Sequence, residues 1–485
     1  MKPARLVFPG LRWAERGLEE VWREARRSID LGVGGFVVFG GSVTGMRELV
    51  GRARDHAGRA LLFAADLERG AGQQLAEATP LPPAAALARL DDAALLGAAR
   101  LTAQEAAAAG IGWVLAPVAD LDVEPANPIV GTRSFGADAA AVADRVRAWI
   151  VAAQSEGVLA CAKHFPGHGR TTSDSHAGLP VVPAPRETLA ADLIPFEAAI
   201  SVGVGSIMMA HVSYPALDSS GTPASLSPRI IAYLRDALGY DGLIASDALI
   251  MEAVAQAGRS EREAAVQAVR AGCDALLYPG SVDATVAALE GALRSGDLTA
   301  ERIAQALVRV EQAAYGSAVP AGEVRAVASS AQALSLAVAS IREMRGSPRR
   351  LSPGQTVRLH IIDDDISWGP PLVFPEAARP DRRRLAAALT ERGARFPGSE
   401  AGADVDLVAV FSEVRGWKGR AVLSSETRRR LIRVVEQVTD PTVVLFGHPR
   451  LAAELPSAGS LVCAWCGDPL MQEAVAALLF RGAPA

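Results

Sequence analysis

Short apolar runs alternate with longer segments of helical period over residues 1–316. The runs are rich in Val, Ile and Leu, which is typical of strands that are buried on both faces of a parallel sheet. Eight such units within about 315 residues predict an α/β fold, a (β/α)8 TIM-like barrel, with a doubly wound open sheet as the alternative. The runs cover 4–10, 33–40, 60–68, 111–120, 158–165, 205–212, 242–249 and 273–280.

The pattern changes after residue 316. The stretch 323–346 is rich in alanine and has a helical period, so it predicts a long helix. Four later apolar runs, "TVRLHIIDDD", "VDLVAVFS", "TVVLFGHP" and "SLVCAWCG", are separated by helical segments and predict a smaller α/β domain. The Pro/Gly-containing stretch 347–355 is typical of a linker. We therefore expect a barrel over 1–316, a helical linker over 317–355 and the α/β domain over 356–485.

Ionisable residues end several of the barrel's apolar runs. The carboxyl ends of barrel strands surround one mouth, so side chains from different runs would face one cavity. A polar residue at a single strand end can simply lie near solvent, but the recurrence on successive runs favours a shared site. These residues are Asp66, Glu68, Asp120, Lys163, His164, His211 and Asp247.

Composition removes several classes of function. The formal net charge of −5 argues against a nucleic-acid partner, which would need a basic face. Cys463 and Cys466 have C-x-x-C spacing, but no second pair or nearby histidine supports a metal or redox role. No run approaches about 18 uninterrupted apolar residues, and Pro9 and Gly10 interrupt the N-terminal stretch early. We expect a soluble, cytoplasmic protein without a membrane partner.

The segment 163–180, "KHFPGHGRTTSDSHAGLP", holds three of the seven histidines. His164 and His168 have the spacing of a helical metal-binding pair, but Pro166 and Gly167 exclude a helix. A phosphate-binding G-x-x-x-x-G-K-[ST] motif is also absent from this segment. We therefore expect no metal and no cofactor, and His168 is interpreted as a structural residue of the loop.

The same segment contains a candidate acid/base pair. Asp174 lies two residues before His176, so its carboxylate could orient the imidazole and raise its pKa. A histidine adjusted in this way is a useful proton donor near neutral pH. Taken alone, however, His176 is more simply interpreted as a histidine of a surface loop.

Several motifs together resemble one enzyme family. "KHFPGHG" followed by "DSH" resembles the signature of glycoside hydrolase family 3 enzymes of the β-N-acetylhexosaminidase type. "NPIVGTRSFG" (127–136), "MMAHVSYPALD" (209–218) and "SDALIM" (246–251) resemble other segments of that group and follow in its order. The resemblance covers about residues 1–316 and extends to "VASIREMR" and "VVLFGHPRLAAELP" in the second domain.

This resemblance implies a role for each candidate residue. Asp247 would be the nucleophile of a retaining glycosidase, and His176, partnered by Asp174, would be the acid/base. The substrate would be a small carbohydrate, a terminal β-linked N-acetylglucosamine, with cell-wall sugar recycling as the implied setting. The sugar-binding residues would be Asp66, Arg133, Lys163, His164 and His211.

Other functions remain open at this stage. A family 3 β-glucosidase and an N-acetylglucosaminide phosphorylase are the enzymatic alternatives, and a non-catalytic sugar-binding protein is another. The Asp-x-His spacing argues against a glucosidase, whose acid/base carboxylate generally comes from elsewhere. The chain also departs from the family pattern in three places, with Arg69 and Ala71 in the loop after the third run and Ala248 after the nucleophile.

Overall fold

The chain forms two compact units, and each is described by itself. The computed structural model describes residues 2–13, 16–175, 178–251, 253, 260–317, 330–364, 381–397, 402–413 and 418–481. The barrel unit comprises Met1–Pro80, Asp92–Glu124 and Ser134–Val327. The C-terminal unit comprises Leu81–Asp91, Pro125–Arg133 and Ala328–Ala485, so it includes two segments that lie between barrel elements in the sequence.

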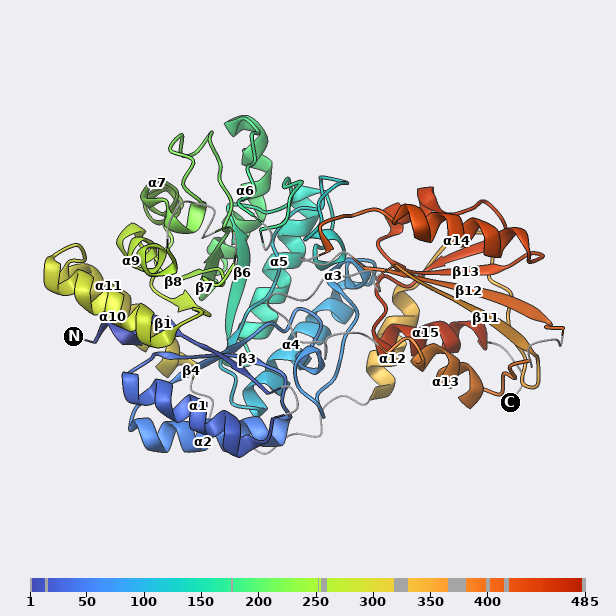
Figure 1. The fold of residues 1–485 in the computed structure, drawn as a ribbon, viewed down its shortest axis with the longest axis horizontal. Helices are drawn as coiled ribbons and strands as arrows, with labels where there is room; N and C mark the ends of the chain where they lie inside the picture. The colour runs from blue at the N-terminus through green and yellow to red at the C-terminus, as the bar shows by residue number, and fades with distance from the viewer. Residues whose placement is uncertain are drawn as a thin grey trace. The chain divides into compact units, whose positions relative to one another are not determined.

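The barrel unit contains eight parallel strand positions in chain order (Figure 1). The first position consists of β1 (Val7–Phe8) and β2 (Gly10–Arg12), and β2 pairs with β3 (Gly35–Phe39). β1 pairs in parallel with the last strand, β9 (Leu276–Leu277), and a bridge between Ala245 and Ala275 joins β8 to β9. The sheet therefore closes on itself, which confirms the predicted barrel rather than the open sheet.

The remaining strands and helices of the barrel unit alternate along the chain, as the periodicity predicts. The strands are β4 (Leu62–Ala65), β5 (Trp113–Val114), β6 (Leu159–Phe165), β7 (Ser206–Met209) and β8 (Leu243–Ser246). The helices are α1 (Leu18–Leu31), α2 (Val43–Ala57), α4 (Asp92–Ala108), α5 (Ala139–Gln154), α6 (Arg186–Ser201), α7 (Pro228–Ala232), α9 (Glu261–Ala271), α10 (Val282–Ser295) and α11 (Ala300–Gly316).

Burial explains why the apolar runs become strands. Every residue of β4, β7 and β8 is buried, as expected for strands covered on both faces. Local signals begin the helices between them: Ser260 forms a reciprocal capping box with Glu263 at the start of α9. Asp138 accepts a hydrogen bond from the backbone of Ala141 at the start of α5. These signals fix where the helices begin.

The C-terminal unit is built on a five-stranded sheet in the order β10-β14-β13-β12-β11, parallel except for β10. Figure 1 shows α14 on one face of this sheet and α12, α13 and α15 on the other. Its strands are β10 (Arg342–Arg345), β11 (Val357–Asp363), β12 (Val405–Ser412), β13 (Thr442–Gly447) and β14 (Ser460–Cys463). Its helices are α3 (Ala84–Leu87), α12 (Ser330–Ser340), α13 (Arg384–Glu391), α14 (Ser425–Glu436) and α15 (Pro469–Leu479).

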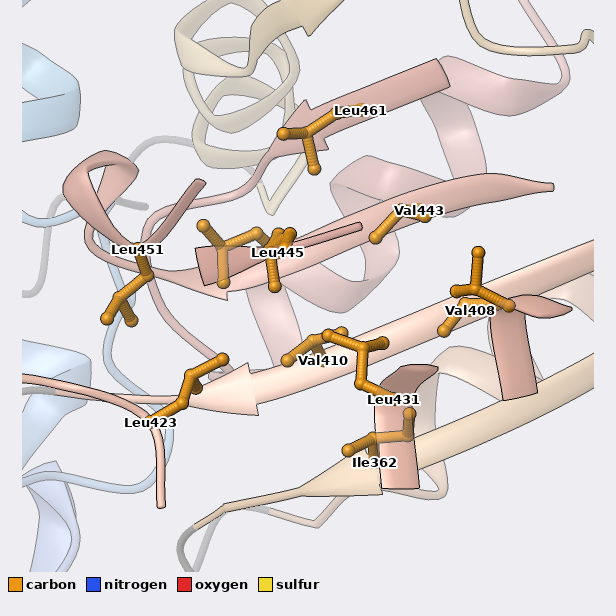
Figure 2. Packing of buried hydrophobic residues seen from close by; sticks show 11 residues of the cluster. Ile362, Val408, Val410, Leu423, Leu431, Val443, Leu445, Leu451 and Leu461 are labelled. Atoms are coloured by element: carbon orange, nitrogen blue, oxygen red, sulfur yellow. The ribbon is translucent and has the colours of Figure 1, made fainter. Parts of the chain in front are cut away.

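A compact apolar core lies between this sheet and α14 (Figure 2). Val408 and Val410 of β12 and Val443 and Leu445 of β13 pack with Leu431 of α14, and all five side chains are fully buried. Burying an aliphatic side chain of this size is worth about 1.5–3 kcal/mol, so this layer is a major source of the unit's stability.

One element of the C-terminal unit differs from the sequence prediction. The long helix expected over 323–346 ends in the structure at Ser340, and the next residues form the edge strand β10. Arg342 pairs with Cys463 and Glu343 with Val462, so the segment is held by β14, far away in the sequence. Residues 342–345 form a strand despite the helical pattern of the sequence, because they pair with β14. A local pattern cannot indicate this long-range pairing. Residues 323–329 lie outside the described residues.

Candidate active site

Four strands of the barrel unit bring the predicted residues to one edge. Asp66 follows β4, and His211 follows β7. Lys163 and His164 lie among the last residues of β6. Asp247 comes directly after β8. Because these strands are parallel, their carboxyl ends meet at the same mouth of the barrel. The structure therefore places these five residues as the apolar runs predict.

Lys163 is the centre of an ionic cluster at this mouth. Its ammonium group lies 2.5 Å from Asp66 Oδ1 and 2.8 Å from Glu68 Oε1. The Lys163 side chain is 2% exposed, whereas that of Asp66 is 34% exposed. Two carboxylates compensate the buried cation, which would otherwise be costly to desolvate. The exposed part of Asp66 leaves a carboxylate at the mouth that can accept hydrogen bonds from hydroxyl groups.

His164 is oriented by Asp120. His164 Nδ1 donates to Asp120 Oδ2 at 2.8 Å, and Asp120 Oδ1 accepts from the backbone N–H of His164 and of His168 at 3.0 and 2.7 Å. This pairing places the proton on Nδ1 and leaves Nε2 as a hydrogen-bond acceptor. Asp120 is fully buried; the sequence pattern places it among the strand-end residues of the shared site but assigns it no role. Its position at the end of the fourth apolar run was the available signal.

The loop after β6 is held from several sides. His168 Nδ1 lies 2.8 Å from Thr171 Oγ1, and His168 Nε2 lies 3.3 Å from Ser175 Oγ. Burial, with a smaller contribution from the charge of His164, lowers the pKa of His168 to about 4. His168 is therefore neutral near pH 7 and serves as an internal hydrogen-bonding group of the loop.

Close packing fixes the path of this loop. A Cβ atom on Gly169 would lie 1.9 Å from the carbonyl oxygen of Leu121, so only glycine fits there. Arg170 Nε donates to Asp192 Oδ2 of α6 at 2.6 Å. Burial raises the pKa of Asp192, and the pairing with Arg170 partly offsets that rise. These contacts hold the start of the segment that leads to the predicted acid/base pair.

Of the predicted acid/base pair, only Asp174 lies among the described residues. Asp174 is buried, and its carbonyl oxygen accepts from the backbone N–H of Gly178 at 3.0 Å. His176 lies outside the described residues. The predicted interaction between Asp174 and His176 therefore stays a prediction.

Asp247 is half-buried at the end of β8. Its Oδ1 accepts from the backbone N–H of Ala248 at 2.8 Å, and its own N–H donates to the Met209 carbonyl at 3.2 Å. The strand that it follows, β8, pairs in parallel with β7, so Asp247 lies at the same end of the sheet as His211. A carboxylate in this position can attack an electrophilic carbon of a ligand bound at the mouth.

His211 lies behind the nucleophile candidate. It is fully buried; its Nδ1 lies 2.6 Å from Ser225 Oγ, and its Nε2 donates to the Ala248 carbonyl at 3.2 Å. Both ring nitrogens therefore contact protein atoms. In this arrangement His211 fixes the backbone next to Asp247.

Arg133 belongs to the other compact unit. It ends the short 3-10 helix η3 (Gly131–Arg133), within the segment Pro125–Arg133 of the C-terminal unit. Asn127 shapes this segment: its side-chain oxygen accepts from the backbone N–H groups of Ile129 and Val130 at 2.9 and 2.7 Å.

Within the described part of the chain, no group of three or more His, Cys, Asp or Glu side chains is arranged to hold a metal ion. Within the same residues, no helix is both long and apolar enough to cross a membrane.

Comparison with known proteins identifies the family. Residues 18–313 match the model of the glycosyl hydrolase family 3 N-terminal domain, which is more than half of the chain. The chain belongs to glycosyl hydrolase family 3. It is therefore a glycoside hydrolase, as the resemblance of its motifs predicts.

Relatives within the family agree with the assignment. The chain is 37% identical over 268 residues to a β-hexosaminidase of Bordetella pertussis, covering 52% of this chain and 75% of that protein. It is 29% identical over 477 residues to a β-N-acetylglucosaminidase/β-glucosidase of Cellulomonas fimi, covering 87% of this chain and 82% of that protein. A family 3 β-N-acetylglucosaminidase from Paenibacillus sp. str. FPU-7 has a similar structure, with a TM-score of 0.83, 27% identity, and coverage of 100% of this chain and 97% of that one.

Proposed function

We propose that this glycoside hydrolase is a retaining exo-β-N-acetylhexosaminidase that removes terminal β-linked N-acetylglucosamine. The observation that carries the proposal is the position of Asp247 at the end of β8. It lies at the same mouth as the ion pairs of Lys163 and the loop that leads to "DSH". The names of the Bordetella and Paenibacillus relatives support this choice of substrate. The barrel over 1–316 would carry the chemistry, and 356–485 would form a supporting α/β domain.

The reaction would proceed in two displacements. In the first, a carboxylate oxygen of Asp247 attacks the anomeric carbon, and His176 donates a proton to the glycosidic oxygen as the aglycone leaves. In the second, His176 removes a proton from water, which attacks the same carbon and releases Asp247 as a carboxylate. Asp174 would orient His176 and stabilise its protonated form.

The mouth of the barrel would recognise the sugar through its hydroxyl groups. The exposed carboxylate of Asp66 and Nε2 of His164 would accept hydrogen bonds, while the Lys163 ammonium group would donate them. The guanidinium group of Arg133 would offer a planar pair of donors to hydroxyl or acetamido oxygens. His211, the remaining proposed binding residue, would contribute by fixing the chain beside Asp247.

The biological setting is part of the same proposal. Cell-wall fragments are the natural substrate that the family resemblance implies, with hydrolysis in the cytoplasm as a step of sugar recycling. The Cellulomonas relative also carries the name β-glucosidase. A panel of aryl glycosides that compares N-acetylglucosaminide with glucoside, and water with added phosphate as the acceptor, would decide between the alternatives.

Replacing Asp247 by alanine tests the mechanism directly. The variant should lose at least about a thousandfold in turnover of an aryl N-acetylglucosaminide, because the covalent intermediate cannot form. A slow 2-deoxy-2-fluoro substrate should add one sugar mass to the wild-type peptide that contains Asp247. Asp283, an exposed carboxylate of α10, provides the control, since Asp283→Ala should leave turnover unchanged.

Substrates with different leaving groups extend this test to the acid/base. His176→Ala should slow poor leaving groups most, and azide should rescue the second step, because azide needs no general base. A sugar label on another carboxylate would contradict the role of Asp247. Equal slowing of all substrates without azide rescue would contradict the role of His176.

A further inference from the structure

The loop that carries Arg133 belongs to a different compact unit from the strands that precede and follow it. Pro125–Arg133 lies between β5 and β6 in the sequence, yet it is part of the C-terminal unit, as is Leu81–Asp91. Helix α3 of the latter segment contacts both η3 and α12 within that unit. Residues of the C-terminal unit therefore help to hold the segment that ends at Arg133.

The segment has a defined internal structure. Asn127 is fully buried, and its side-chain oxygen closes a turn by accepting from two successive backbone N–H groups. Ile129 and Val130 are buried as well. Gly131 then has φ +43°, a left-handed conformation that leads the chain into η3 and Arg133. A shift at the start of this short segment would therefore be passed on to Arg133.

Arg450 holds the start of the segment. Its Nη1 donates to the carbonyl oxygen of Pro125 at 2.7 Å, and its Nε donates to Nδ1 of His448 at 2.9 Å. The backbone N–H of Arg450 donates to the same nitrogen at 3.1 Å. His448 directly follows β13, so the guanidinium group is oriented from the end of a central strand of the sheet. The hydrogen bond from Nε to His448 thus fixes the plane of the guanidinium group, and in this orientation Nη1 points at the carbonyl oxygen of Pro125.

We infer that Arg450 is a positioning residue for Arg133, acting through the Pro125 carbonyl. This inference rests on the proposed function for the contact between Arg133 and the sugar. Arg450 itself touches no substrate in this scheme. Loss of its hydrogen bond releases one end of the segment and misplaces the donors of Arg133, and substrate binding weakens because rigid placement is what makes such a contact effective.

A double-mutant cycle in the full-length enzyme tests the inference. Arg450→Ala should raise KM for an aryl N-acetylglucosaminide about three- to tenfold with kcat within about twofold of wild type. Arg133→Ala should raise KM more. The double variant should resemble Arg133→Ala alone within about twofold, because Arg450 acts only through Arg133. Arg450→Lys should recover part of the loss, since an ammonium group can still reach the Pro125 carbonyl.

Arg345 is the matched control. It donates from β10 to the carbonyls of Pro456, Ala458 and Gly459, so it also holds backbone of the C-terminal unit, but away from Pro125. Arg345→Ala should leave KM unchanged even if it lowers the unfolding temperature. His448→Ala, which removes the group that orients Arg450, should raise KM by less than Arg450→Ala and serves if the latter fails to fold.

The outcomes separate the inference from the function on which it rests. If the losses of Arg133→Ala and Arg450→Ala multiply in the double variant, Arg450 acts independently and the inference is wrong. The same holds if Arg345→Ala raises KM as much as Arg450→Ala does. If Arg133→Ala leaves KM unchanged, the sugar-binding role of Arg133 fails instead.

Discussion

Both units place an ionic cluster at the carboxyl ends of parallel strands, but the two clusters are closed to different degrees. In the barrel unit, Lys163 lies between Asp66 and Glu68, and we call these three residues the Lys163 cluster. In the C-terminal unit, Asp364 follows β11 and pairs with Lys418 and Arg420, and we call these three the Asp364 cluster. Both lysine side chains are 2% exposed, whereas Asp66 is 34% and Asp364 0% exposed.

The Asp364 carboxylate is fully occupied by neighbouring protein groups. Its Oδ1 accepts from Thr427 Oγ1 at 2.6 Å and from the backbone of Ser424 at 3.1 Å, while Oδ2 lies 3.0 Å from Ser412 Oγ. Burial alone would raise the pKa of Asp364, but the hydrogen bond from Arg420 and the charge of Lys418 hold it well below its usual range. Such a closed network stabilises the fold and leaves little capacity for a ligand.

The Lys163 cluster is arranged the opposite way, with a buried cation and a carboxylate that reaches the mouth of the barrel. A ligand can replace water at Asp66 without breaking the buried part of the cluster. The same strand-end position thus carries an open cluster, for which we propose substrate binding, in one unit and a closed cluster that stabilises the fold in the other. Exposure of the carboxylate, rather than the presence of an ion pair, distinguishes the two uses.

Of the changes in the two clusters, replacing Asp66 by asparagine should produce the larger kinetic effect. We expect kcat/KM for an aryl N-acetylglucosaminide to fall about a hundredfold or more, because the exposed acceptor at the mouth loses its charge. The free energy of unfolding should change by no more than about 1 kcal/mol, since Glu68 still neutralises Lys163. Steady-state kinetics and urea unfolding measure the two quantities. A variant with normal kinetics and a large loss of stability would show that the Lys163 cluster is structural.

The corresponding change in the C-terminal unit should reverse this result. Asp364→Asn should lower the free energy of unfolding by about 3–5 kcal/mol, because Lys418 and Arg420 lose their shared partner. Below its unfolding temperature the variant should keep the kcat and KM of the wild type. Loss of activity without loss of stability would instead assign the Asp364 cluster to a ligand-binding role.

The sequence predicts much of the fold and part of the site, and the limits have physical causes. The barrel strands were predicted because burial on both faces leaves a local mark in each apolar run, and the family was predicted from its motifs. Strand β10 was missed because its partner, β14, lies far away in the sequence. The support that Asp120 gives to His164 was missed because it depends on the pairing of neighbouring strand ends. The assignment of Arg133 to the C-terminal unit depends on tertiary packing, which no local pattern records.

The smallest effect, a dependence of stability on pH, should separate the two units further. Burial lowers the pKa of His168 in the barrel unit to about 4, against about 6.5 in an unfolded chain. The unfolded state therefore binds a proton that the folded state excludes. The contribution of neutral His168 is complete above about pH 6.5 and is lost as the pH falls toward 4, at up to about 1.4 kcal/mol per pH unit.

Asp364 should affect the stability of the fold over a lower range of pH, because its pKa in the folded state is depressed. Its contribution is present above about pH 4, where the unfolded carboxyl group is ionised, and is lost only as the pH falls further. Urea unfolding from pH 7 to 3 measures both windows when wild type is compared with His168→Gln and Asp364→Asn. The difference from His168→Gln should shrink between pH 6.5 and 4, while that from Asp364→Asn stays constant until the pH falls below about 4. Two differences that change together over one window would show that a single cooperative titration governs both units, and that the closed and open clusters are not independent.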